Sequence, residues 1–402
     1  MVISIGTDCS GMETPIMALQ NLNIKVDHLF SCDISAAAKK TIEANYPPKI
    51  FYDNLMERDN SCASVPKVDV YVAGFPCQPF SAAGKQQGFS DEAGRGTIFF
   101  GVREYIKKKQ PKVFILENVS GLLRLKGGEY FRDIMKSLEA LKTYNIYWQM
   151  LNTKEHGVAQ NRKRVYLVGI DKKVDKGTFT FPEPLPPTSL SELLDPKKGK
   201  VDWSMLPPKS SGTAHRNTIL ALKKLFAAGR DPFNEPWVVD VDSSTDRMKF
   251  MYDISPCLTC SRAAGHWITN RGRRMNVREQ SRCQAVKYEE MTVAVTERQL
   301  GFQLGNAMSV NCLERIFVRL LPAAGLAKAS ALKDVWEARA QTKRKRTVTN
   351  AEMKLKMAKA GAKASTRLTR TQQSWAADAK VAAKRKVPAL ISRAELKRKR
   401  SQ

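Results

Sequence analysis

A single cysteine, Cys77, lies between proline and glutamine in a stretch that runs from Gly74 to Phe100 and ends in a glycine-rich loop. A cysteine thiolate is a strong nucleophile, and a nearby cation or helix start lowers its pKa. A lone cysteine is more often a small core residue, but a core residue needs neither the flanking prolines nor the loop. The stretch therefore predicts a nucleophile at a pocket mouth, covered by a loop.

Two further groups could complete the chemistry around such a nucleophile. Glu117 follows the apolar run 113–116, and a carboxylic acid with a raised pKa can share a proton with a substrate nitrogen. Arg162 and Arg164 alternate just before the run 165–170, so both point to one side and can bind a carbonyl oxygen or a phosphate. Taken singly, Glu117 fits a helix cap and the arginines fit a solvated strand edge. Their shared position at strand ends favours one site.

The first 170 residues alternate between strand-like and helix-like patterns that would bring these groups together. Strands are predicted at 2–5, 26–32, 68–73, 113–116 and 165–170, and helices at 13–21, 36–45, 99–109 and 130–141. Near-continuous apolar strands separated by helices indicate a parallel sheet covered on both faces, a doubly wound Rossmann-like α/β fold. Ligands of such sheets bind beyond the carboxyl ends of the strands, where residues 6–11, Asp33, Asp53, Cys77 and Glu117 all fall.

The pattern changes after residue 170. Residues 182–208 are rich in proline, serine and lysine, and residues 209–285 show little periodicity and many basic side chains. We therefore expect a smaller, irregular domain over 171–285. Helix-like apolar spacing returns in 300–321, and from 322 onward the chain is rich in alanine, lysine and arginine, which predicts a basic tail that is mostly mobile.

The net charge of the chain is +28, and residues 341–402 contain 19 Lys and Arg against 3 Asp and Glu. This excess predicts an anionic partner, most simply nucleic acid. Basic clusters at 343–346, 384–386 and 397–400 suggest a nuclear protein or non-specific DNA contacts. A solvated tail is the alternative, and in a prokaryotic or viral protein the location would be the cytoplasm or nucleoid. No apolar run reaches the ~18–20 residues of a membrane helix, so no membrane partner is expected.

Eight cysteines are scattered along the chain without the rhythm of a disulfide framework, which favours a reducing, intracellular setting. Cys257 and Cys260 form one Cys-x-x-Cys pair, and the nearest further ligand is a lone His266. A zinc site needs a second pair of ligands at similar spacing. The sequence therefore predicts no metal site.

Several blocks occur in one order along the chain: GFPCQPFSAAGKQQGF, GRGTIFF, ENVSGLL, QNRKRVYL, RRMNVREQSRCQ and FQLGNAMSV. They resemble the signature blocks of the cytosine C5 DNA methyltransferases, and the resemblance covers about residues 1–321. It implies a methyltransferase sheet in residues 1–170, a target-recognition domain in 171–285, a return segment in 286–321 that completes the catalytic domain, and the basic tail in 322–402.

The resemblance also implies a mechanism for the candidate residues. The target cytosine would be swung out of the duplex into the pocket. Cys77 would attack C6 while Glu117 binds or protonates N3, and Arg164, supported by Arg162, would hold the base. C5 would then take the methyl group of S-adenosylmethionine, and loss of the C5 proton and of Cys77 would release 5-methylcytosine. The loop over 81–96 would close over the base.

The family pattern assigns the cofactor site position by position. Gly11 lets the backbone approach the methionine portion of S-adenosylmethionine, Asp33 binds the ribose hydroxyls, Ile34 packs on adenine, and Asp53 accepts from the adenine amino group. The pocket would be lined by Pro76 and Ile98 and closed by Asn306. For Asp33 and Asp53 the alternative is capping or a turn, and for Asn306 a turn.

The chain departs from the family in its first turn, Cys9 to Thr14. The usual aromatic residue is missing, and Glu13 occupies the place of a glycine. The segment 285–300 also lacks the family's glycine–aromatic–proline run. We expect the departure in the first turn to bear on cofactor affinity more than on chemistry.

Double-stranded DNA is the expected substrate, and a monomer is the expected state. Candidate DNA contacts are Ser81, Gln86, Arg262, Arg273 and Arg274. A transfer-RNA cytosine methyltransferase is a second hypothesis, but its relatives carry Cys-Phe-Thr where this chain has Cys-Leu-Thr at 257–259. A catalytically silent DNA-binding or chromatin protein is a third, which the retained Cys77, Glu117 and Arg164 oppose.

Overall fold

The fold is built around one central sheet in a computed structural model that describes residues 2–76 and 98–344. Within these residues seven strands have the order β3-β2-β1-β4-β5-β7-β6. Their bounds are β1 Val2–Asp8, β2 Lys25–Cys32, β3 Ile50–Tyr52, β4 Val70–Ala73, β5 Val113–Val119, β6 Tyr144–Asn152 and β7 Lys163–Asp171. The doubly wound α/β prediction is confirmed, with one change: β7 runs antiparallel to both β5 and β6, so the sheet is mixed and not parallel throughout.

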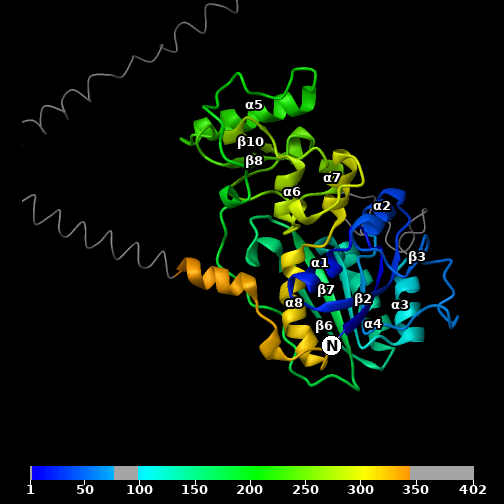
Figure 1. The fold of residues 1–402 in the computed structure, drawn as a ribbon. Coiled ribbons are helices and arrows are strands. Elements are labelled where there is room, and N and C mark those ends of the chain that lie inside the picture. Colours follow the sequence, from blue (N-terminus) through cyan, green and yellow to red (C-terminus); the bar gives the residue numbers. More distant parts are fainter. Residues whose placement is uncertain (1, 77–97, 345–402) are drawn as a thin grey trace, which may run out of the picture. The chain divides into compact units, whose positions relative to one another are not determined.

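Helices cover both faces of this sheet (Figure 1). On one face lie α1 (Thr14–Asn21) and α8 (Val310–Ala323), which share a core with β1. On the other face lie α3 (Ile98–Lys109) and α4 (Glu129–Glu139). Each helix buries a stripe of apolar residues; in α4 these are Tyr130, Phe131, Ile134 and Leu138. Such spacing places them on one side of a helix, which explains why this pattern was readable from the sequence.

Two strands were missed in the sequence because their patterns are weak. β3 has three residues, and β6 is an edge strand that exposes Trp148 and Met150 on one face while its polar residues interrupt the apolar run. The helix α2 (Ala36–Asn45) was predicted with the correct bounds. It begins after Ser35, whose hydroxyl accepts a hydrogen bond from the Ala38 amide, as preferred N-cap residues do.

Residues 190–283 contain a second, antiparallel sheet, and we call this part the target lobe after the target-recognition role that the sequence analysis predicts for it. Its strand order is β11-β10-β8-β9, with bounds β8 Trp237–Val239, β9 Phe250–Tyr252, β10 Trp267–Ile268 and β11 Arg273–Arg274. The helix α5 (Gly212–Ala227) packs Ala221 beside Val239 and Val241. The sequence predicted an irregular region here and missed this 16-residue helix. The helix α6 (Val277–Cys283) ends the lobe.

The helical pattern predicted over 300–321 is two helices in the structure. α7 (Glu297–Asn306) begins with a capping box between Thr296 and Gln299, and α8 follows after a short break at 307–309. The folded unit continues past residue 322 to Ala340. Leu326 and Leu332 are buried there, so the first part of the predicted tail belongs to the catalytic unit.

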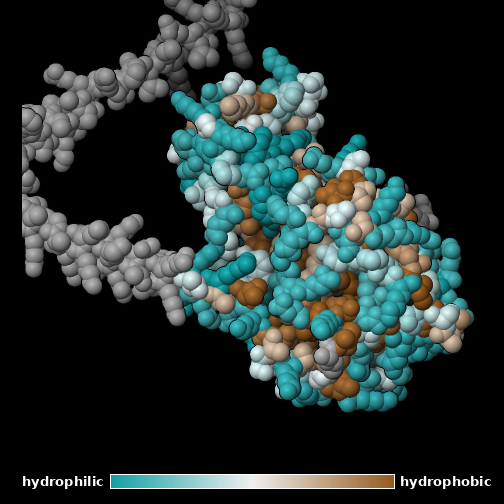
Figure 2. Space-filling view, viewed as in Figure 1, coloured by the Kyte–Doolittle hydropathy of each residue, from teal (hydrophilic) through white to brown (hydrophobic). Residues whose placement is uncertain are grey.

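Hydrophilic residues dominate the face shown in Figure 2, and apolar residues reach it in separate patches. Among the described residues, no helix has the length and the apolar composition that crossing a membrane requires.

Candidate active site

The carboxyl ends of β4 and β5 lie side by side and carry the candidate catalytic residues. Ala73 is in register with Leu116, so the chain leaves β4 next to Glu117. The amide of the buried Asn118 donates a hydrogen bond to the carbonyl oxygen of Phe75 at 3.4 Å. This contact ties the end of β5 to the segment that leads to Cys77. Cys77, Ser81 and Gln86 lie outside the described residues.

Glu117 and Arg164 form an ion pair between the neighbouring strands β5 and β7. Arg164 Nε lies 3.0 Å from Glu117 Oε1, and both side chains are nearly buried. Burial raises the pKa of the Glu117 carboxyl, and the nearby positive charges of Arg164 and Arg162 partly oppose this increase. A buried acid with a raised pKa can donate a proton or a hydrogen bond to a ring nitrogen.

Arg162 has a different environment from Arg164. It is 1% exposed, and its guanidinium donates to the backbone carbonyls of Leu258 (2.7 Å), Gly305 (3.1 Å) and Ala307 (2.7 Å). Arg162 therefore connects β7 to the target lobe and to the return segment. The part in holding the base that the sequence analysis predicts for Arg162 stays a prediction.

Cys257 was considered in the sequence only as a zinc ligand and as part of the Cys-Leu-Thr triplet, yet it lies against both arginines. Its Sγ is 3.6 Å from Arg162 Nη1 and 3.9 Å from each terminal nitrogen of Arg164. The pKa of this thiol is lowered because the attraction of the two guanidinium groups outweighs the effect of burial. No local sequence signal reveals this position, because the lobe and the sheet meet only in the tertiary structure.

The predicted cofactor residues gather at the neighbouring strand ends of β1, β2 and β3. The turn after β1 places Gly11 so that its amide donates to Asp33 Oδ2 at 2.9 Å, and the Ser35 amide donates to Asp33 Oδ1 at 2.9 Å. Burial raises the pKa of Asp33, and the two backbone hydrogen bonds oppose the increase. The Asp33 amide in turn donates to the Tyr52 carbonyl, which brings Asp53 next to it.

The atypical first turn has a backbone conformation that glycine adopts most easily, and the buried side chain of Glu13 supports it. Cys9, Gly11 and Glu13 all have positive φ, between 52° and 59°, a conformation that is uncommon outside glycine. The Glu13 carboxylate is fully buried and accepts hydrogen bonds from the hydroxyls of Thr7 and Ser31, both at 2.6 Å. Glu13 thus lies beneath the turn, where its side chain supports the turn from the core side.

The remaining predicted cofactor residues vary in exposure. Ile34 is 85% exposed, and Asp53 is exposed and paired with Lys39 at 3.0 Å. Pro76 is half-buried after β4, Ile98 begins α3, and Asn306 is exposed at the end of α7.

Two observations indicate that the residues at these strand ends can bind S-adenosylmethionine. A carboxylate has about four lone-pair sites, and Asp33 uses two for the turn, so hydroxyl groups of a ribose can still bind. The large apolar side chain of Ile34 beside it is uncovered, which is the surface an adenine ring would pack on. Asp33 and Ile34 would hold the nucleoside, and the turn at Gly11 would lie along the methionine portion.

The three arginines predicted to contact DNA are each paired inside the target lobe. Arg262 binds Asp240, Arg273 binds Glu279, and Arg274 binds Asp242, with closest distances of 2.5, 2.8 and 2.7 Å. The structure therefore gives all three a role within the lobe, and a DNA contact by any of them stays a prediction.

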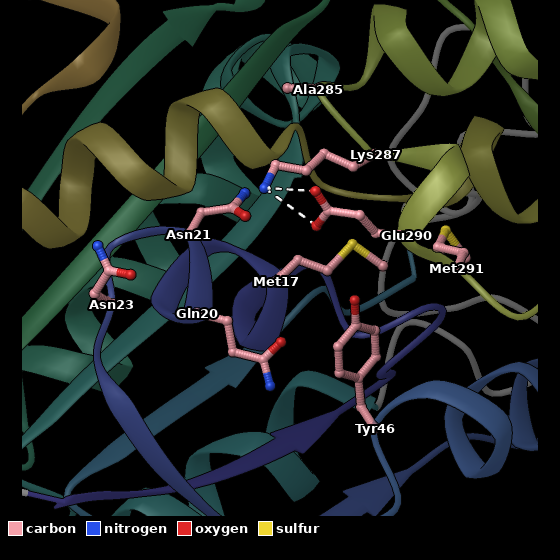
Figure 3. Close-up of a pocket in the computed structure, with 9 residues that line it drawn as sticks. All are labelled: Met17, Gln20, Asn21, Asn23, Tyr46, Ala285, Lys287, Glu290 and Met291. Carbon is pink, nitrogen blue, oxygen red and sulfur yellow. Dashed lines mark hydrogen bonds and ion pairs between the residues drawn. The ribbon is translucent and has the colours of Figure 1, made fainter.

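A hollow of about 200 Å³ elsewhere on the catalytic domain contains none of the candidate residues (Figure 3). Met17 and Asn21 of α1 line it together with Tyr46, and the ion pair of Lys287 and Glu290 borders it. Among residues 2–76 and 98–344, no three His, Cys, Asp or Glu side chains are placed to hold a metal ion.

Comparison with known proteins places this arrangement in a family. The family model described as C-5 cytosine-specific DNA methylase matches residues 3–321. The chain is 33% identical to the type II methyltransferase M.NgoBI of Neisseria gonorrhoeae over 71% of its length and 84% of that protein. It is 31% identical to M.SsoII of Shigella sonnei over 74% of both chains.

Solved structures share the fold at low sequence identity. The methyltransferase EhMeth of Entamoeba histolytica superposes with a TM-score of 0.56 at 16% identity, covering 80% of this chain and 98% of that one. Dnmt2 of S. pombe gives a TM-score of 0.53 at 16% identity with the same coverage. These likenesses support the fold alone.

Proposed function

The chain belongs to the family of C-5 cytosine-specific DNA methylases, and from this premise we propose that Cys77, Glu117 and Arg164 carry out the reaction on a cytosine flipped out of duplex DNA. The protein is a DNA cytosine-5 methyltransferase that uses S-adenosylmethionine, as the sequence predicted. The roles of the individual residues are the proposal.

In the proposed mechanism Cys77 attacks C6 of the cytosine as a thiolate. A bond forms between sulfur and C6, and the electrons of the C5–C6 double bond move toward C5. Glu117, whose pKa is raised by burial, lies at the N3 edge, where its carboxyl group shares a proton with the ring nitrogen and so offsets the negative charge that develops in the ring. When bound, S-adenosylmethionine supplies an electrophilic methyl group, which C5 accepts. A water molecule accepts the C5 proton, and departure of the Cys77 thiolate then restores the double bond.

Arg164 orients the base in this mechanism. Its guanidinium is fixed by Glu117 at 3.0 Å and by the carbonyl of Lys163 at 2.8 Å. A planar guanidinium held in this way can donate to the O2 carbonyl of cytosine without losing its contact with Glu117. Arg162 supports the position of Arg164 by anchoring the start of β7 through its three hydrogen bonds to backbone carbonyls.

The observation that carries the proposal is the buried ion pair of Glu117 and Arg164 at the edge where β4 leads toward Cys77. The test is transfer of a radiolabelled methyl group from S-adenosylmethionine to unmethylated duplex DNA. Wild type should label cytosine, and Cys77→Ala should bind DNA and give no label. Transfer by Cys77→Ala at the wild-type rate would contradict the assignment. A parallel transfer-RNA arm distinguishes the RNA hypothesis.

Three finer predictions remain part of the proposal. The net charge of +28 supports duplex DNA as the bound form of the substrate. The basic clusters beyond residue 342 motivate a nuclear location; the relatives described above include bacterial enzymes and lend it no support. A monomer in solution is expected and can be tested by light scattering.

A further inference from the structure

Residues 329–336 follow the part of the chain that matches the family and pack back onto the catalytic unit; we call them the strap. They begin with a short 3-10 turn at Ala329–Ala331, and Leu332 is buried in the same core as α1 and α8. The family match ends at residue 321. The strap therefore contributes contacts that the family pattern does not describe.

The first contact of the strap is a buried ion pair with α8. Asp334 Oδ2 lies 2.8 Å from Arg315 Nε, and the two side chains are 7% and 1% exposed. The same guanidinium lies 2.5 Å from His156 Nδ1 and donates to the carbonyl of Glu183 at 2.8 Å. Arg315 thus links the strap to residue 156, at the turn between β6 and β7.

The second contact is made by Trp336. A Cβ atom at Gly157 would lie 2.6 Å from the indole Cε3 atom, so the ring packs directly on the glycine backbone, which has φ +94°. The indole N–H donates to Glu314 Oε2, and Glu314 is 3% exposed. Both contacts of the strap therefore converge on His156 and Gly157.

His156 and Gly157 belong to the loop 153–161, which leads directly to the residues of the candidate active site. Asn311 of α8 donates to the His156 carbonyl at 2.8 Å. A few residues on, Gln160 accepts a hydrogen bond from the Leu258 amide at 3.0 Å and donates to the Cys283 carbonyl at 2.6 Å. Arg162 and Arg164 follow at once. The loop therefore sets where the two arginines enter the site.

We propose that the strap is a positioning element for methyl transfer: Asp334 and Trp336 hold the loop 153–161, and so fix Arg162 and Arg164 beside Glu117. Asp334 acts through Arg315 and His156, and Trp336 acts through Gly157. The inference rests on the proposed function for its kinetic consequence. The mechanical link to the loop can be measured independently.

The experiment compares the full-length protein with Asp334→Asn and Trp336→Leu. The matched control is Leu138→Ala, which opens a cavity in α4 on the other face of the sheet. Single-turnover methyl transfer is measured at saturating DNA and S-adenosylmethionine, at temperatures equally far below each variant's Tm. Hydrogen exchange of the peptides that cover 153–164 is recorded in parallel.

Both strap variants should transfer methyl groups roughly 10- to 100-fold more slowly than wild type, the scale expected for a small misplacement of catalytic groups. Their Kd for S-adenosylmethionine should change less than twofold, and exchange over 153–164 should increase. Leu138→Ala should show neither effect. Trp336→Phe keeps the ring on Gly157 and should retain most of the rate.

An unchanged rate in both strap variants, or a loss equal to that of Leu138→Ala, would overturn the proposal. Unchanged exchange over 153–164 would overturn it as well. If wild type transfers no methyl group to DNA, the proposed function fails, and the exchange comparison alone decides whether the strap holds the loop.

Discussion

Charged side chains at the β5–β7 edge and in the target lobe are paired in different ways. At the edge, within the part of the chain that the structure describes, Arg162 and Arg164 both lie near the Glu117 carboxylate, and their positive charges also lower the pKa of the Cys257 thiol. In the lobe, each of the arginines predicted for DNA binding has its own carboxylate.

This contrast distinguishes charges that are arranged to bind a ligand from charges that stabilise the fold. A buried edge at which two guanidinium groups lie together favours an electron-rich partner such as a pyrimidine carbonyl. One-to-one pairs in the lobe neutralise each other and stabilise an irregular chain with little core. Substitutions at the edge should therefore mainly change the rate of methyl transfer, whereas substitutions in the lobe should mainly change the free energy of unfolding.

The largest effect is expected at the edge. Glu117→Gln keeps the shape of the side chain and removes the carboxyl group that can donate and accept a proton. Methyl transfer should fall by roughly 10²- to 10⁴-fold, the usual contribution of a positioned acid. Tm should fall as well, because the Arg164 guanidinium loses the carboxylate with which it is paired, so the rates are compared at temperatures equally far below each Tm. Single-turnover rates and thermal melts check this. A rate near that of wild type would remove Glu117 from the mechanism.

A second effect concerns the loop that supports the edge. His156 is buried against Arg315. Burial and the nearby Arg315 charge lower its pKa from 6.5 to about 4, and the Asp334 charge partly opposes this decrease. Above pH 6.5 the imidazole is neutral in both the folded and the unfolded chain. Between pH 6.5 and 4 the unfolded chain takes up a proton that the folded chain excludes, so stability is lost as pH falls.

The loss from this group should reach roughly 3 kcal/mol in the free energy of unfolding near pH 4. Urea unfolding at several pH values is the measurement, and His156→Gln is the comparison because it cannot titrate. The difference between the two proteins should be constant above pH 6.5 and change below it. Parallel curves through this range would exclude His156 as the titrating group.

In the target lobe, replacing Arg273 should affect the free energy of unfolding more than the affinity for DNA. Its partner Glu279 is fully buried and also accepts from the amides of Asp195 and Asn276. Arg273→Ala leaves that carboxylate without its cation and should cost roughly 1–3 kcal/mol in the free energy of unfolding. Glu279→Gln should reduce this cost in the double variant. Additive costs would show that the pair is not coupled.

The smallest effect is expected at Arg274, whose pair with Asp242 is partly exposed. Arg274→Ala should change the free energy of unfolding by less than about 1 kcal/mol. If the side chain leaves Asp242 for a phosphate, the slope of log affinity against log salt should decrease in magnitude by about 1, and this is the outcome we expect. An unchanged slope would place Arg274 with the charges that only hold the lobe.

Five of the seven strands of the central sheet, and the candidate residues at their ends, could be predicted from the sequence. Apolar runs and helical stripes are local patterns, and strand ends can be read where such runs stop at Asp33 or Glu117. Because strands that run parallel in one sheet place their carboxyl ends at the same edge, the proximity of the cofactor and catalytic residues followed from these patterns. The family and the reaction followed from the ordered blocks and are confirmed.

The remaining features could not be read from local sequence patterns. The reversal of β7, the helix α5, the place of Cys257 against two arginines and the pairing of each lobe arginine depend on segments far apart in the chain. The strap is the clearest case. A basic, alanine-rich sequence predicted a mobile tail, yet Asp334 and Trp336 find buried partners on α8 and at Gly157. Such contacts have no periodicity, because they are set by where the folded core leaves a complementary surface.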